Sequence, residues 1–198
     1  WALRESERQF GGGLVLHNGD LLLATLGERH VGEYDTPGHP LVEDATAPLP
    51  PGGIAQSFSA SAVVRLRVDA DGTMKRMGQV ILRNGDVSCA MLDASGDVAY
   101  FGTAGAPAAL HKLDLVRWPD TGDRDANVET ISLEVADGPI VSCALDLQRQ
   151  IAYLALGGAS GRVVGVSLPS NGPMRRLPGF IRAPGHLVAA TPPPSGRG

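Results

Sequence analysis

A segment of about fifty residues occurs twice in a row in this chain, and this repetition limits the folds that the chain can adopt. Residues 87–103 (VSCAMLDASGDVAYFGT) return as residues 141–156 (VSCALDLQRQIAYLAL). The offset is 54 residues at the VSCA match and 53 residues at the Ala-Tyr match. A weaker earlier copy lies at residues 14–26, and a fourth copy begins at residues 185–190 (GHLVAA). Such a repeat predicts one supersecondary unit that is stacked several times.

Each unit has the pattern of four short β-strands. Val64, Leu66 and Val68 alternate with charged residues, and residues 110–115 and 128–135 alternate in the same way. Four strands in about 40–50 residues are typical of propeller blades. A sandwich does not repeat its sequence so closely, and the repeats of a β-helix are much shorter. We therefore expect an all-β chain of β-propeller blades.

The repeat also resembles a known family. The motifs that carry the resemblance are D-x-S-G-D-V-A-Y-F-G-T at residues 93–103 and V-E-T-I-S-L-x-V-A-D-G-P-I-V-S-C-A at residues 128–144. They are similar to the YVTN and NHL class of β-propeller repeats, over about residues 10–190. The chain departs from that pattern at residues 148–150, where Gln-Arg-Gln replaces a glycine-bearing turn. The resemblance implies a disc of radial blades, each of which starts with its innermost strand.

These patterns predict about three four-stranded antiparallel blades plus an extra strand. Since propellers close with about 4–8 blades, we expect the chain to be part of a larger propeller or to be completed by another chain. We expect residues 1–13 to be the end of a preceding blade or an N-terminal segment. Three blades follow, at residues 14–84, 85–138 and 139–184, and the first of them contains a long insertion at 27–60. Residues 185–198 are expected to be the first strand of a further blade with a Pro-rich tail.

Charge and hydropathy exclude two classes of partner. Seventeen basic residues stand against twenty-one acidic ones without a basic block, so we expect no nucleic acid. No apolar run approaches the roughly 20 residues of a membrane helix, so we expect no membrane insertion. The chain begins with Trp1 rather than methionine, and we expect it to be processed or cut from a longer protein.

The sequence contains no motif that predicts catalysis. Its five histidines lie in neither a zinc-protease motif nor a Cys/His zinc spacing. The glycine run at residues 11–13 does not precede a helix, and no G-x-S-x-G elbow occurs. We therefore predict no catalytic, cofactor-binding or metal-binding residues, no cofactor, and a protein that is not an enzyme.

The two cysteines, Cys89 and Cys143, occupy matching positions of the VSCA repeat. Equivalent positions on neighbouring inner strands can lie close enough for a disulfide. The apolar strand context favours buried thiols instead, because free cysteine is among the most buried residue types. We expect both cysteines to be reduced and buried, and this expectation leaves the cellular compartment undetermined.

The absence of enzyme motifs favours a non-catalytic propeller segment that acts as a structural or protein–protein interaction module. Its expected partners are other protein chains or the rest of its own propeller. The alternative is a propeller that binds a small ligand or a carbohydrate at the mouth of the central channel. The insertion at residues 27–60 is the main candidate for a contact surface because it is long and partly apolar. The candidate partner-binding residues are Trp118, Val31, Leu41, Val42 and Phe58.

Overall fold

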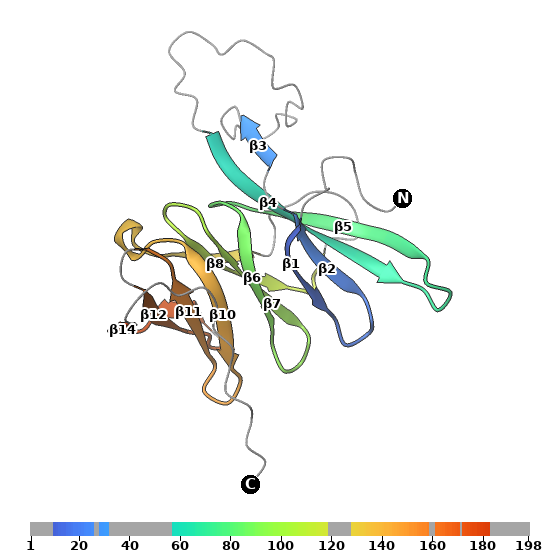
Figure 1. The fold of residues 1–198 in the computed structure, drawn as a ribbon. Helices are drawn as coiled ribbons and strands as arrows, with labels where there is room; N and C mark the ends of the chain where they lie inside the picture. Colours follow the sequence, from blue (N-terminus) through green and yellow to red (C-terminus); the bar gives the residue numbers. More distant parts are fainter. Residues whose placement is uncertain are drawn as a thin grey trace.

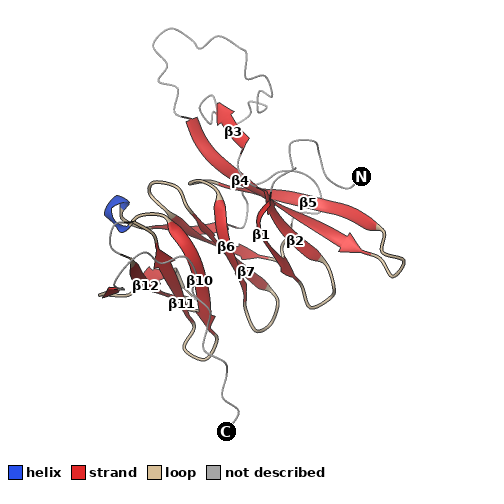
Figure 2. Cartoon of the chain, in the orientation of Figure 1, coloured by secondary structure: helices blue, strands red, loops and turns tan. Residues whose placement is uncertain are grey.

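A computed structural model describes residues 10–25, 28–31, 57–118, 128–158, 161–170 and 172–182. These residues form three antiparallel sheets that stand side by side like blades of a propeller (Figure 1). Their secondary structure is almost entirely β, with one short 3-10 helix, Val135–Asp137, between the second and third sheets (Figure 2). The expected fold class of four-stranded antiparallel blades is thus confirmed. Within these ranges, no helix has the length and apolarity that crossing a membrane requires.

The first blade is built from residues on both sides of the long insertion. Its strands, from the innermost outward, are β1 (Phe10–Val15), β2 (Leu21–Thr25), β4 (Ser57–Val68) and β5 (Met74–Leu82). The innermost strand starts at Phe10, inside the segment 1–13 that the sequence pattern placed before this blade. The glycine run at residues 11–13 is therefore part of a strand.

The two ends of the insertion pair with each other. β3 (Glu28–Val31) forms an antiparallel ladder with the first four residues of β4, in which Val31 lies opposite Ser57. This two-stranded ribbon extends β4 away from the three sheets (Figure 1). The insertion is therefore not a loop throughout, because both of its ends are strands.

The second and third blades follow the same order. The second contains β6 (Val87–Leu92), β7 (Val98–Thr103), β8 (Ala109–Asp114) and β9 (Val128–Ser132). The third contains β10 (Ile140–Asp146), β11 (Ile151–Leu156) and β12 (Arg162–Ser167), with β13 (Arg175–Arg176) and β14 (Ile181–Arg182) both at its outer edge. The fourth copy of the repeat at 185–190 lies outside the described residues.

Two apolar cores hold the blades together. Between the first and second blades, Leu22 and Val63 pack with Phe101 of the second blade. Between the second and third blades, Tyr100 and Leu154 belong to one buried cluster. The innermost strand β6 contacts both β1 and β10, so the three inner strands lie next to one another. Because adjacent strand residues point to opposite sides, each blade uses one face for each neighbour.

The two cysteines form a disulfide between the inner strands β6 and β10. Their Cα atoms are 5.9 Å apart, a separation that a disulfide normally spans. The expectation of two reduced thiols was therefore wrong. Among the cysteines of this chain none is free.

The strand register explains why the cysteines face each other. Leu92 lies opposite Ala99 in the second blade, and Leu145 lies opposite Ala152 in the third, so the blades superpose with an offset of 53 residues. Cys89 and Cys143 are 54 residues apart and are therefore one position out of step. A one-residue step turns a strand side chain to the other face. Cys89 consequently faces the third blade, while Cys143 faces the second blade. Two cysteines at equivalent positions would face the same way and could not meet.

Candidate functional site

The outer edge of the third blade is interrupted. β13 and β14 both pair with β12, and the Leu177 N–H still donates to the Gly165 carbonyl at 2.8 Å, but residues 178–180 (PGF) leave the ladder. Pro178 has no N–H to donate to a ladder, and Gly179 adopts a φ of 84°, which favours glycine. Gly165 in the neighbouring strand makes room for the Leu177 side chain, since a Cβ there would lie 3.0 Å from it. The second blade has the continuous strand β9 at this edge.

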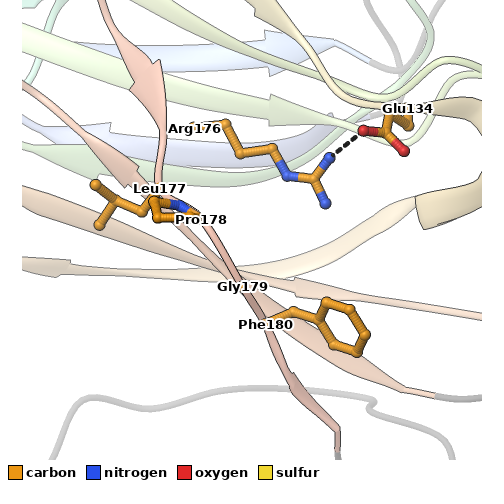
Figure 3. Close-up of a pocket in the computed structure, with 6 residues that line it drawn as sticks. All are labelled: Glu134, Arg176, Leu177, Pro178, Gly179 and Phe180. Carbon is orange, nitrogen blue, oxygen red and sulfur yellow. Dashed lines mark hydrogen bonds and ion pairs between the residues drawn. The ribbon is translucent and has the colours of Figure 1, made fainter.

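The interruption borders a shallow, open cleft of about 430 Å³. Its lining combines the connection between the second and third blades with the broken edge: Glu134, Arg176, Leu177, Pro178, Gly179 and Phe180 (Figure 3). The ring of Phe180 is 43% exposed, so a large aromatic surface faces solvent beside charged groups. An aromatic ring with a few fixed polar groups is a common composition for a small-molecule site. We call this site the arginine cleft.

A network of ion pairs fixes one side of the arginine cleft. Arg176 contacts Glu134 at 2.8 Å and Asp137 at 3.0 Å. The Asp137 side chain is only 1% exposed, and its other carboxylate oxygen accepts the Glu134 backbone N–H. Since a guanidinium group donates in a rigid plane, these contacts hold the orientation of Arg176.

Two more arginines flank the ring of Phe180. The guanidinium carbon of Arg162 lies 4.9 Å from the ring centroid, and that of Arg182 lies 5.5 Å from it. Both distances permit a cation–π interaction. Arg162 also approaches Asp137, at 3.6 Å. The cluster thus holds three arginines, Arg162, Arg176 and Arg182, against two carboxylates, in a chain whose net charge is −4.

This arrangement can hold a polar ligand through directed hydrogen bonds. The guanidinium groups offer planar donors, Glu134 offers an exposed acceptor, and Phe180 offers apolar surface. Across the described ranges, no group of three or more His, Cys, Asp or Glu side chains is placed to bind a metal ion.

The residues that the sequence marked for partner binding lie elsewhere. Trp118 is only 7% exposed and packs into the core between the first two blades, 6.0 Å from the Arg65 guanidinium. Val31 belongs to β3 and Phe58 to the paired part of β4. Leu41 and Val42 lie outside the described residues. The structure therefore brings Val31 and Phe58 into one ribbon and places Trp118 apart from them.

A buried histidine stands apart from the arginine cleft. His111 of β8 is 1% exposed, and its Nδ1 lies 2.9 Å from the Thr130 hydroxyl. Burial lowers its pKa from 6.5 to about 4, while the Arg83 backbone opposes this shift. His111 is therefore neutral at pH 7, and its position opposite Phe101 makes it part of a blade interface.

Comparisons with known proteins identify no family for this chain. No protein-family model matches the chain, and no curated protein matches it. Among solved structures, the chain is similar to a periplasmic gluconolactonase from Pseudomonas aeruginosa, with 12% identity and a TM-score of 0.36. The match covers 90% of this chain and 56% of that one, so the chain spans little more than half the length of that structure. A similarity at this level assigns neither activity nor substrate to the chain, and the resemblance to YVTN and NHL repeats stays a prediction.

One functional expectation is nevertheless corrected. The sequence pattern favoured a non-catalytic structural or interaction module, whereas the matched structure is a gluconolactonase, which is an enzyme. The expectation had rested on missing motifs, and a fold does not by itself determine function, since functional residues often lie on loops. The prediction that the chain is not an enzyme stays untested.

Proposed function

We propose that this protein binds a small polar ligand in the arginine cleft of the third blade. The observation that carries the proposal is the break at residues 178–180, which places the half-exposed Phe180 in one lining with the fixed side chains of Arg176 and Glu134 (Figure 3). The ligand class agrees with the small-ligand alternative from the sequence, but the site lies at a blade edge rather than at the channel mouth.

The ion pairs support binding because they fix the site before a ligand arrives. Asp137 is held by the Glu134 backbone and by Arg176, and Arg176 is held by both carboxylates. Groups that are already ordered lose less conformational entropy when they bind a ligand. The break in the outer strand adds a backbone that is not engaged in a sheet at residues 178–180.

A matched pair of phenylalanine variants tests the proposal. Phe180 and Phe10 are both 43% exposed, but only Phe180 lines the cleft. We expect Phe180→Ala to weaken ligand binding about tenfold, equivalent to about 1.4 kcal/mol, and Phe10→Ala to leave it unchanged. Isothermal titration calorimetry with neutral sugars, sugar acids, sugar phosphates and amino acids supplies the readout. The proposal fails if none of these binds at millimolar concentration, or if the two variants behave alike.

A further inference from the structure

The charges around Phe180 are not balanced. Asp137 makes its shorter contact with Arg176, at 3.0 Å, and its longer contact with Arg162, at 3.6 Å. Glu134 pairs with Arg176 as well, at 2.8 Å. Both carboxylates are thus directed mainly to one arginine. Arg182 has no acidic partner among the described residues.

The strand register places the two remaining arginines directly opposite each other. Arg162 of β12 is the Cα partner of Arg182 of β14. Like charges at opposite ladder positions repel and destabilise a sheet. Phe180 lies two residues before Arg182, just outside β14, and both guanidinium groups contact its ring. Two positive charges therefore flank one exposed residue, and within the described part of the chain one long ion pair offsets them.

We infer that the ligand of the arginine cleft carries an anionic group, a carboxylate or a phosphate, which binds between Arg162 and Arg182 beside Phe180. This inference rests on the proposed function. Carboxylates and phosphates match the paired N–H groups of guanidinium and bind them bidentately. An anion at this point neutralises the Arg162–Arg182 repulsion, and Glu134 and Arg176 remain available for the polar body of the ligand.

The test compares two neighbouring arginines on opposite faces of the edge. Arg182 flanks Phe180, whereas Arg175 pairs with Ser167, one residue out of step with Arg176, and so points away from the cleft. Calorimetric titrations use gluconate, glucose 6-phosphate and neutral glucose as probes. We expect Arg182→Gln to weaken binding of at least one anionic probe tenfold or more, and Arg175→Gln to change it less than twofold. The stronger of the two anionic probes identifies carboxylate or phosphate as the preferred group.

The outcomes separate this inference from the proposed function. If neutral glucose binds as tightly as both anions and responds to Phe180→Ala but not to Arg182→Gln, the cleft binds a ligand and the anionic inference is wrong. If none of the three probes binds, the anionic inference is wrong, and the proposed function fails as well if amino acids also do not bind. Affinity for the preferred anion should also fall between 50 and 300 mM salt, because the contact is between exposed charges; an unchanged affinity contradicts the inference.

A second measurement does not depend on finding the natural ligand. Inorganic phosphate should raise the melting temperature of the wild-type protein more than that of Arg182→Gln, because binding to the folded state stabilises it. Without phosphate and at low salt, Arg182→Gln should melt at the same or a higher temperature than wild type, since the substitution removes a repulsion. A lower melting temperature in the variant, or an equal shift by phosphate in both proteins, overturns the assignment.

Discussion

The second and third blades offer the same kind of face to a following blade, but only the second has such a neighbour among the described residues. Tyr100 and Tyr153 are equivalent at the offset of 53 residues. Tyr100 is 3% exposed beneath the third blade, whereas Tyr153 is only partly buried. Val98 and Ile151 form a second equivalent pair, and Val98 packs against the core that Tyr100 joins. The repeat thus determines the chemistry of a blade face, while the burial of its side chains depends on what covers that face.

The largest expected effect comes from removing the disulfide, because it links the covered face of the second blade to the third blade. Replacing both cysteines, Cys89→Ser with Cys143→Ser, should lower the free energy of unfolding by about 4 kcal/mol, as expected from the loop that the cross-link closes. Urea denaturation with and without a reductant measures the loss. The double variant should be insensitive to the reductant. If the reductant leaves the wild-type transition unchanged, the cross-link does not stabilise the interface.

Truncating the paired tyrosines sharpens the comparison directly. Tyr100→Ala should lower the free energy of unfolding by about 3 kcal/mol, because it leaves a cavity at a buried site. Tyr153→Ala should lower the free energy of unfolding by about 1 kcal/mol, since this residue is already partly exposed to solvent. Urea denaturation of the two variants gives both values. Equal losses would show that the face of the third blade is covered as fully as that of the second.

The buried histidine of the second blade, His111, makes the stability of the protein depend on pH. Its pKa is lowered to about 4 in the folded state, so between about pH 6.5 and 4 the unfolded chain binds a proton that the folded chain does not. Stability should therefore fall as the pH drops from 7 to 5, by about 2 kcal/mol from this group. Denaturation at the two pH values measures the change.

The exposed His17 supplies the control for that experiment. His111→Gln should flatten the dependence of stability on pH, and His17→Gln should leave it as in the wild type. An unaltered slope in His111→Gln would mean that other groups cause the acid sensitivity.

The strands and blades could be predicted from the sequence because each of them depends on local alternation. The pattern at Val64, Leu66 and Val68 falls within β4, and the repeats at 87–103 and 141–156 fall on two successive blades. The disulfide could not be predicted in this way. Identical VSCA letters suggested equal positions, but the ladders set the true offset, and a single residue decides which face a side chain occupies.

The arginine cleft was missed for a different reason. Its only local signal is Pro178-Gly179 within a run that otherwise suits an outer strand, and such a pair marks a turn or a break. Its other parts come from elsewhere in the chain, since Glu134 and Asp137 lie on the connection between two blades and Arg162 lies on β12. Only the stacking of blades brings these charges together, so no contiguous motif records them.

The ribbon of β3 and β4 determines where an additional segment can be inserted into this chain. Val31 and Ser57 are Cα partners, so the two ends of whatever joins them are held about 5 Å apart. The register of the first blade is set independently, by the pairing of β4 with β2 and β5. Because each doubling of a loop costs only about 0.6 kcal/mol in closure entropy, length added between these two residues hardly changes the stability of the blades. We therefore expect a reporter or a whole domain inserted between Val31 and Ser57 to leave the pairing of the three sheets unchanged.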